Sequence, residues 1–409
     1  MADRSADFLL IGGGVAAAGC ARRLREEGAG GSILLVGREQ DPPYDRPPLS
    51  KGYLRGETSR EDALVVPPGW WEDNDVELLT RTSVMGIDPD ARTTKLSTKE
   101  EVGFDRALLA TGANVRRLRA EGGDLDGIHY LRAFGNSDAI RTDVEEAERV
   151  VLVGGSYIAT EVAASLTAMG KRCTLLMQEG VTLERSFGRE VGGFFHGLLE
   201  EHGVEIFGSD ELERFEGSDE RVEHVVTKAG RELGCDCAVL GTGVMPDVML
   251  ARRAGLSLGE GGGVECDSRL ETSAPGIFAA GDIAEYESVV HGGSRLRVEH
   301  WDVARAHGET AALNMLGRDV AHSEVPYFFS DLADWSSMEY VGPGSGEPVI
   351  RGSLDDGEFT VFYVDDGRVT AALTVGRSGD LDHARRFIRE GGRPMTHSLA
   401  DEGTDLAGL

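Results

Sequence analysis

Two glycine-rich turns limit the folds open to this chain more than any other feature of its sequence. The first runs Gly12-Gly13-Gly14-Val15-Ala16-Ala17, and the second runs Gly154-Gly155-Ser156-Tyr157-Ile158-Ala159. Each follows a short apolar run and precedes an alanine-rich stretch of helical pattern. Between a strand and a helix, such a turn lets the backbone approach a pyrophosphate, which then meets the free N–H groups of the helix N-terminus. Two turns therefore predict two dinucleotide sites.

The order of apolar runs places one of these units inside the other. Residues 7 to 36 have a strand, turn, helix and strand pattern, which residues 150 to 177 repeat. Two later runs, 107 to 113 and 276 to 282, end in glycine, as is typical of parallel strands whose carboxyl ends face a ligand. From about Val325, short alternating runs separated by Asp-Gly turns indicate an antiparallel sheet.

The predicted fold is α/β, with two Rossmann-like domains followed by a small α+β domain that contains the antiparallel sheet. We place the first, discontinuous domain at residues 1–115 and 246–322, the second at 116–245, and the C-terminal domain at 323–409. The polar tail after about Gly391 is predicted to be loosely ordered.

Composition restricts the partners of this fold. Acidic residues outnumber basic ones by 71 to 42, and the formal net charge is −29, which repels nucleic acid and anionic lipid. A saline habitat and plain solubility explain this acidity equally well. No apolar stretch reaches the ~20 residues that span a bilayer, and the first strand begins too early for a signal peptide. We expect a cytoplasmic protein that binds neither nucleic acid nor membrane, as a monomer or homodimer.

The five cysteines are scattered, as is typical of reduced intracellular thiols. Cys235 and Cys237 form the only suggestive spacing, but Cys237 opens an apolar run and is predicted to be a core residue. Neither a CxxC motif nor a second ligand cluster accompanies the pair. We therefore predict no metal site.

Around the first turn, two residues support nucleotide binding. Ala17 takes the third glycine position of the fingerprint, which requires only a small side chain. Glu39 follows the second strand, where a carboxylate can accept hydrogen bonds from an adenosine ribose. A glycine turn without a nucleotide is the alternative at this point.

The second turn departs from the fingerprint at two positions. Ser156 replaces the middle glycine, and Met177 stands where an acidic residue is expected. Glu179 or Glu184 can reach a ribose instead. No arginine directly follows this strand to receive a 2′-phosphate, which favours NADH over NADPH. A domain that packs but binds no nucleotide is the alternative.

A longer motif helps to decide whether the two glycine turns bind nucleotides. Pro43-Tyr44-Asp45-Arg46-Pro47-Pro48-Leu49-Ser50-Lys51 resembles a segment of oxygenase-coupled ferredoxin reductases, rubredoxin reductases and apoptosis-inducing factor, which belong to the glutathione-reductase-like flavoprotein superfamily. The resemblance covers nearly the whole chain in order and continues at Ala110-Thr111-Gly112, 267–282, 297–302 and 325–331. It implies FAD in the first domain, NAD(P) in the second and a C-terminal interface domain.

The resemblance also implies a catalytic pair. Lys51 would reach the N5 edge of the flavin and pair with Glu161 of the second domain. An ammonium at that edge stabilises negative charge on the reduced ring. A surface lysine and a solvated glutamate are the alternative.

Further cofactor contacts are expected from the motifs. Arg46 suits a pyrophosphate oxygen, Asp282 would accept from the ribityl chain at the start of a helix, and Trp301 would lie beside the pyrimidine. The expected FAD contacts are Gly12, Gly14, Ala16, Ala17, Glu39, Arg46, Lys51, Val84, Ala110, Thr111, Gly112, Arg132, Gly281, Asp282, His300, Trp301 and Phe329. The expected NAD contacts are Gly154, Ser156, Ile158, Ala159, Glu179 and Gly243.

Residues 44 to 51 contain no cysteine, so no thiol is predicted opposite the flavin. Electrons must then leave the flavin directly. The predicted activity is an FAD-dependent NAD(P)H oxidoreductase that passes electrons from NADH through FAD to a ferredoxin or rubredoxin. A slow NADH-binding redox sensor or scaffold like apoptosis-inducing factor, and a quinone reductase, are the alternatives.

Overall fold

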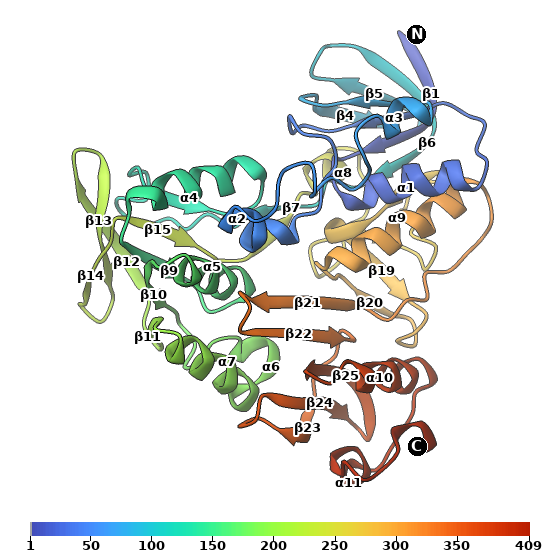
Figure 1. Ribbon diagram of the computed structural model, residues 1–409. Helices are drawn as coiled ribbons and strands as arrows, with labels where there is room; N and C mark the ends of the chain where they lie inside the picture. The colour runs from blue at the N-terminus through green and yellow to red at the C-terminus, as the bar shows by residue number, and fades with distance from the viewer. Residues whose placement is uncertain (1) are drawn as a thin grey trace.

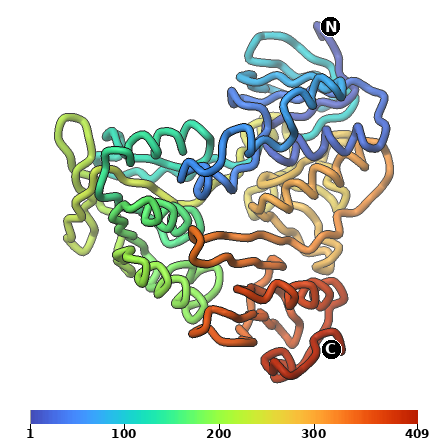
Figure 2. The backbone as a smooth tube through the Cα atoms, viewed as in Figure 1, coloured from blue at the N-terminus to red at the C-terminus, as the bar shows by residue number. Residues whose placement is uncertain are grey.

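The computed structural model describes residues 2–409. The chain forms two α/β units, and an antiparallel sheet packs between and below them (Figure 1). In Figure 2 the N-terminus lies at one end of the molecule and the C-terminus at the other. The predicted fold class is confirmed.

The first sheet has seven strands with a parallel centre. Ile11 pairs with both Val36 and Leu109, so neighbouring parallel strands end level with one another. The strand order is β3 (Val76–Leu79), β2 (Ile33–Val36), β1 (Arg4–Ile11), β6 (Glu101–Leu109), β5 (Thr93–Leu96) and β4 (Val84–Asp88), with β18 (Ile277–Ala279) paired to β6.

Two helices, α1 (Val15–Glu26) and α9 (Trp301–Met315), pack closely against each other on this sheet (Figure 1). A Cβ atom on Gly308 of α9 would lie 2.0 Å from the carbonyl oxygen of Ala16. The glycine and the alanines of α1 therefore allow this approach. The short elements nearby are η1 (Pro47–Ser50), α2 (Gly52–Arg55) and α3 (Trp70–Asp73).

The second sheet is entirely parallel. Its order is β11 (Glu205–Phe207), β10 (Arg172–Leu176), β9 (Arg149–Val153), β15 (Cys237–Leu240) and β8 (Ile128–Tyr130). Its helices are α4 (Phe134–Glu146), α5 (Tyr157–Ala168), α6 (Glu184–Phe187) and α7 (Arg189–Glu201), and a ribbon of β12 (Leu212–Ser218), β13 (Arg221–Thr227) and β14 (Glu232–Gly234) extends from it.

Two antiparallel strands connect the α/β units, β7 (Ala113–Val115) and β16 (Val244–Pro246). Thr111 donates to the carbonyl of Asp247 at 2.7 Å, and Thr242 donates to the carbonyl of Arg116 at 2.6 Å. A threonine hydroxyl thus stabilises each of the two connections between the α/β units. The return segment contains α8 (Met249–Arg253), β17 (Val264–Cys266), η2 (Gly281–Ile283), β19 (Ala284–Ser288) and β20 (Ser294–Leu296).

The C-terminal sheet is antiparallel, as the alternating runs predicted. Its order is β21 (Tyr327–Leu332), β22 (Ser336–Val341), β25 (Arg368–Val375), β24 (Glu358–Asp365) and β23 (Glu347–Ser353), followed by α10 (Ser378–Glu390), α11 (Thr396–Ala400) and η3 (Leu406–Gly408).

The prediction of a loosely ordered tail is wrong. Leu399 and Leu406 are buried in the core of the C-terminal sheet. The buried guanidinium of Arg351 donates to backbone carbonyls of this tail, including those of Asp401 and Thr404. Two leucines and one internal arginine therefore order a segment whose composition is otherwise polar.

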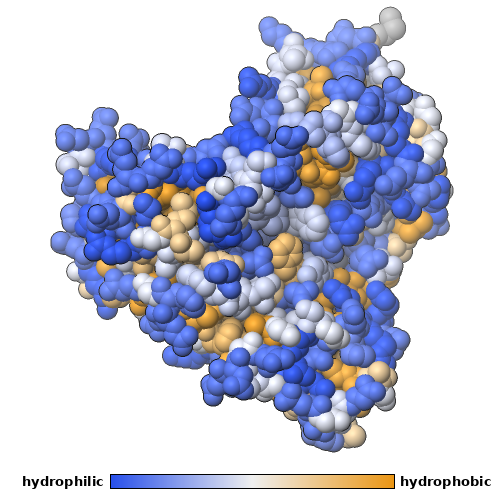
Figure 3. Space-filling view, in the orientation of Figure 1, coloured by the Kyte–Doolittle hydropathy of each residue, from blue (hydrophilic) through white to orange (hydrophobic). Residues whose placement is uncertain are grey.

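One hydrophobic core joins three parts of the chain. It includes Leu49 of the proline-rich loop, Phe187 beside the second sheet, and Tyr340 and Phe359 of the C-terminal sheet. The outer face in Figure 3 is mostly hydrophilic, with scattered apolar patches. No helix within residues 2–409 is long and apolar enough to span a membrane.

Candidate active site

The two glycine turns have the same backbone geometry. Gly14 and Ser156 precede α1 and α5 with φ values of −106° and −100°. Gly12 and Gly154 adopt φ values of +132° and +124°, which favour glycine. The second turn is therefore a complete dinucleotide turn in its backbone, and its serine lies where the first turn has no side chain.

The acidic residue of the second unit is two positions further along than the sequence pattern indicated. Backbone bonds to the strand ends, from Gly12 to Val36 and from Gly154 to Leu176, align the two units. Three residues beyond each strand end lie Glu39 and Glu179. Glu179 is thus the counterpart of Glu39.

The expectation that Met177 stands at the acidic position of the fingerprint is wrong, because Met177 occupies the place of Gly37. Its backbone N–H bonds to Phe207, just as that of Gly37 bonds to Leu79. No arginine follows β10 directly, as the sequence indicated. Arg185, further along the chain, forms an ion pair with Glu179.

A cavity of about 660 Å³ lies where the carboxyl ends of the two sheets face each other. Most of the predicted cofactor contacts line it. They are Gly12, Gly14, Ala16, Glu39, Arg46, Lys51, Val84, Ala110, Thr111, Gly112, Arg132, Gly281, Asp282, His300, Trp301 and Phe329 from the FAD set, and Ser156, Ile158 and Gly243 from the NAD set, together with Glu161.

Four predicted contacts are not on the cavity wall. Ala17 and Ala159 are buried in their helices, and a Cβ on Gly154 would meet the carbonyl of Gly241 at 2.3 Å. These three residues pack against the protein side of their turns and do not line the cavity. Glu179 lies beside the second turn and is held by Arg185.

Two buried polar atoms of the cavity wall test whether a dinucleotide fits. Arg132 Nε and His300 Nδ1 have no hydrogen-bond partner among the residues that the structure describes. A Cβ placed on Gly14 would meet no atom within 4 Å. Open space at a helix N-terminus, beside unsatisfied polar groups, fits an anionic dinucleotide.

Glu39 and Arg46 form an ion pair at the cavity wall, with 2.6 Å between Oε1 and Nη2. Tyr44 donates to the other carboxylate oxygen at 2.5 Å. Burial alone would raise the pKa of Glu39, but Arg46 and the Tyr44 hydroxyl outweigh it and lower that pKa. Arg46 therefore anchors Glu39, which stays ionised at neutral pH.

Asp282 differs in setting from the helix N-terminus that its sequence predicted. It lies in a single 3₁₀ turn, η2, which leads directly into β19. Its carboxylate instead forms an ion pair with Arg132 at 3.0 Å across the cavity wall. Gly281 adopts a φ of +75° at this turn, which places the turn beside the N-terminal part of α1.

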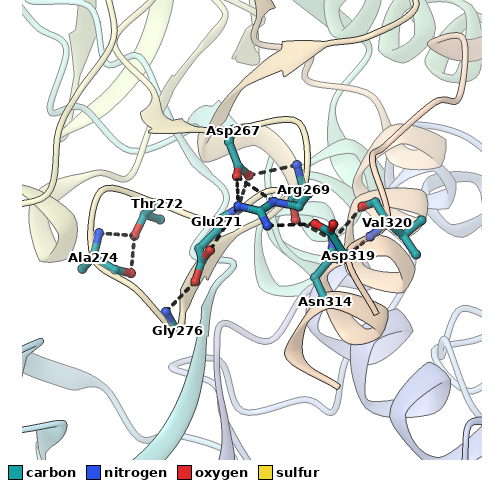
Figure 4. Close-up of polar contacts among 9 residues, drawn as sticks. All are labelled: Asp267, Arg269, Glu271, Thr272, Ala274, Gly276, Asn314, Asp319 and Val320. Atoms are coloured by element: carbon teal, nitrogen blue, oxygen red, sulfur yellow. Dashed lines mark hydrogen bonds and ion pairs between the residues drawn. The ribbon is translucent and has the colours of Figure 1, made fainter. Parts of the chain in front are cut away.

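The motif before β18 is fixed by a polar network (Figure 4). Asp267 accepts the backbone amides of Arg269 and Glu271 and also binds the Arg269 guanidinium at 2.8 Å. Asn314 of α9 donates to the carbonyls of Arg269 and Val320, both at 2.8 Å. This network ties the segment that leads to Gly281 to the end of α9.

Lys51 and Glu161 meet inside the cavity, at 2.8 Å between Nζ and Oε1, and their side chains are 12% and 5% exposed. The structure therefore brings together the predicted pair and rules out the alternative of two solvated residues. Ser50 and Ser330 also donate to Glu161, each at 2.5 Å. Sequence reasoning assigned no role to either serine.

A second cavity, of about 490 Å³, adjoins the first. Strand β21 forms the wall between them. Phe328 and Ser330 line the first cavity, Asp331 lines the second, and Phe329 lines both. Trp301 also lines both cavities, and its Nε1 donates to Asp45 at 2.6 Å. Trp301 and Phe329 are therefore wall residues of both cavities.

Two aromatic groups complete the first cavity. Tyr157, inside the second turn, has its ring 5.0 Å from that of Phe328. Its place in the glycine motif was the signal that could have identified it. The His300 ring lies 4.5 Å from the same Phe328 ring in a tilted arrangement, and burial lowers the pKa of His300 to about 4. The imidazole is therefore neutral at pH 7.

No thiol or metal cluster enters this site. All five cysteines are buried free thiols, and burial raises the pKa of Cys237 to about 12. Within residues 2–409, no group of three metal-ligating side chains comes together. The cavity wall presents the ammonium, carboxylate, hydroxyl and aromatic groups described above.

Two dinucleotide turns that face one cavity, with a buried Lys–Glu pair between them, define a flavin- and pyridine-nucleotide-dependent oxidoreductase. The family model described as pyridine nucleotide-disulphide oxidoreductase matches residues 6–308, and the reductase C-terminal model matches residues 327–409. The chain belongs to this family, in its ferredoxin reductase group, whose members use FAD and NAD(P)H.

Several relatives match over nearly the full length. The anthranilate 1,2-dioxygenase system ferredoxin–NAD(+) reductase component of Burkholderia cepacia is 34% identical, covering 98% of this chain and 99% of that protein. The benzene 1,2-dioxygenase system ferredoxin–NAD(+) reductase subunit of Pseudomonas putida is 34% identical, with coverages of 97% and 96%.

Solved structures agree with these matches. The ferredoxin reductase for the CYP199A2 system from Rhodopseudomonas palustris has a TM-score of 0.93 at 29% identity, with 99% of each chain covered. The covalent putidaredoxin reductase–putidaredoxin complex also gives a TM-score of 0.93, at 30% identity, and covers 100% of this chain and 98% of that chain. The predicted family and enzyme class are confirmed.

Proposed function

We propose that this enzyme oxidises NADH and passes the electrons through FAD to a [2Fe–2S] ferredoxin of an oxygenase system. The observation that carries the proposal is the Lys51–Glu161 pair, which lies between the two dinucleotide turns and against the β21 wall. Relatives named as ferredoxin reductases of dioxygenase systems, and the putidaredoxin complex, support the acceptor.

The first turn and its surroundings would hold FAD, which when bound supplies a hydride-accepting ring that can release electrons singly. Gly14 leaves room for a pyrophosphate at the start of α1, and Glu39 would accept hydrogen bonds from the ribose. Lys51 places an ammonium in the cavity, where it would stabilise negative charge on the reduced ring. Tyr157 and Phe328 contribute aromatic rings to the same cavity wall.

The second turn would hold NADH. The serine hydroxyl of Ser156 contacts the carbonyl of Gly241 at 3.3 Å, which turns it away from the pyrophosphate position. Glu179, the counterpart of Glu39, would accept the ribose hydroxyls, and this favours NADH over NADPH because a 2′-phosphate would meet a carboxylate. Arg185, which pairs with Glu179, is the cation that would have to bind a 2′-phosphate.

Replacing Glu179 by Ala should raise the KM for NADH about tenfold, because ribose hydroxyls lose a charged acceptor. The KM for NADPH should fall relative to that for NADH, since Arg185 is then unpaired. Steady-state kinetics with both nucleotides measure this ratio. Glu190→Ala makes the same charge change on an exposed site and serves as the control. Equal KM values for NADH in the two variants would remove Glu179 from the site.

The second cavity is where an iron–sulfur partner would approach the flavin. Phe329 lies in the wall between the cavities, with its ring 5.7 Å from Lys51 Nζ. Trp301 stands beside it. No cysteine lies within this wall, so the electrons would cross it without a thiol intermediate.

Replacing Phe329 by Ala should raise the KM for ferredoxin about thirtyfold, since truncating an aromatic interface anchor costs about 2 kcal/mol. Ferricyanide needs no docking surface and provides the control acceptor. Turnover with ferricyanide should fall less than threefold. A matching loss with both acceptors would place Phe329 in the flavin site and not at the docking surface.

The test of the proposed function is turnover of NADH with a purified [2Fe–2S] ferredoxin, followed as cytochrome c reduction. A quinone used in place of ferredoxin examines the second candidate acceptor.

We place the reaction in the cytoplasm, where NADH is supplied and where the five cysteines stay reduced. The division into residues 1–115 with 246–322, 116–245 and 323–409 also stays a prediction, which limited proteolysis can examine.

A further inference from the structure

We propose that Ser50 and Ser330 are positioning residues that hold Glu161 in place and thereby set how strongly Lys51 favours the reduced flavin. The inference rests on the proposed function and adds two residues to it. Each serine donates to Glu161 at 2.5 Å. Neither serine was expected to take part from the sequence.

The three donors divide the two carboxylate oxygens between them. Oε1 of Glu161 receives the Lys51 ammonium at 2.8 Å and the Ser330 hydroxyl. Oε2 receives the Ser50 hydroxyl. A buried carboxylate needs several donors to replace the water that it has lost. With two hydroxyls supplying part of that need, Glu161 does not depend on Lys51 alone.

This arrangement decides how much of the Lys51 charge is neutralised by its partner. A buried carboxylate with no other donor would be compensated by the ammonium alone, because an uncompensated buried charge is costly. The two hydroxyls compensate part of the Glu161 charge, although the ammonium is in direct contact with the carboxylate at 2.8 Å. Lys51 also contacts the carbonyl of Pro47 at 3.5 Å and the ring of Phe329. Its ammonium can therefore face the cavity while remaining paired.

The two serines and the carboxylate that accepts their hydrogen bonds come from three separate parts of the chain. Ser50 ends η1, Glu161 lies on α5 and Ser330 lies on β21. All three side chains are buried. The carboxylate is thus the point where the proline-rich loop, the second α/β unit and the C-terminal sheet are joined by hydrogen bonds. A shift in the position of β21 would move Ser330 and thereby affect Glu161 and its partner Lys51.

A neighbouring serine supplies a matched control. Ser165 is also fully buried on α5, and its hydroxyl donates to the backbone carbonyl of Ser50 at 2.7 Å. It makes a hydrogen bond of the same kind in the same region. Its hydroxyl makes no hydrogen bond with the Glu161 carboxylate in the part of the chain that the structure describes. Ser165→Ala therefore removes a buried hydroxyl without removing a donor to the carboxylate.

The experiment measures the midpoint potential of the bound flavin by equilibration with reference dyes, without turnover. In the Ser50→Ala/Ser330→Ala variant Glu161 should present more uncompensated negative charge to the cavity, and the equilibrium constant for flavin reduction should fall about tenfold. That change equals about 30 mV for a two-electron couple. Each single variant should give roughly threefold, which serves if the double variant does not retain FAD.

Two further variants decide between positioning and packing. Ser330→Thr keeps the hydroxyl and should restore the wild-type potential, and Ser165→Ala should leave that potential unchanged. An unchanged or raised potential in both single alanine variants would overturn the inference, as would an equal fall in Ser165→Ala. A protein whose flavin NADH does not reduce at all would instead contradict the proposed function, so the two failures are distinguishable.

Discussion

Replacing Lys51 by Met should slow the reduction of the flavin by NADH about a hundredfold. The ammonium is the cation that faces the cavity next to Glu161, and removing one preorganised electrostatic group of this kind costs about 10² in rate. The variant should also lose stability, because Glu161 would remain buried without its cation. Stopped-flow absorbance at the flavin band measures the rate.

The Lys51→Met/Glu161→Gln variant separates the two effects. It removes both charges, so that no uncompensated carboxylate remains and much of the lost stability should return. The rate of flavin reduction should stay low, because the ammonium is still absent. A double variant that recovers the wild-type rate would show that Lys51 acts only by neutralising Glu161. Unchanged reduction in Lys51→Met would remove Lys51 from the reaction.

Replacing Gly14 by Ala should weaken FAD binding about a hundredfold while the fold remains intact. Gly14 has an ordinary extended backbone, with a φ of −106°, and a Cβ there would meet no protein atom within 4 Å. The same Cβ would project into the space at the N-terminus of α1 where the pyrophosphate belongs. Flavin content after dialysis and the FAD dissociation constant measure the effect.

Gly30 offers a matched control, because it also lacks a positive φ and has no atom within 4 Å of a Cβ. Gly30→Ala should retain FAD fully. Gly12→Ala is a different case, since its Cβ would lie 2.0 Å from the carbonyl of Ala110 and should disrupt the turn itself. Full FAD retention by Gly14→Ala would mean that the first turn does not hold the pyrophosphate.

The glycine turns and apolar runs were sufficient to predict the fold class. Fingerprint residues can be recognised locally, because Gly12 and Gly154 adopt backbone conformations that favour glycine. The resemblance carried the prediction of Lys51 and Glu161, which are far apart in sequence and meet only because the second unit folds against the proline-rich loop. No local pattern indicates such a meeting.

Other features depended on three-dimensional register. The sequence offered Glu179 or Glu184 in place of Met177, and the aligned backbone bonds of the two units identify Glu179 as the counterpart of Glu39. Ser50 and Ser330 look like ordinary polar residues of a loop and a strand. The order of the C-terminal tail depends on Arg351, a buried charge that composition alone assigns to the surface.

The most direct test of the central claim is an anaerobic titration of the purified protein with NADH, followed by addition of oxidised [2Fe–2S] ferredoxin. The account predicts that about one equivalent of NADH bleaches the flavin absorbance and that ferredoxin restores it rapidly. A long-lived charge-transfer band that ferredoxin does not discharge would contradict the account and favour a slow redox sensor.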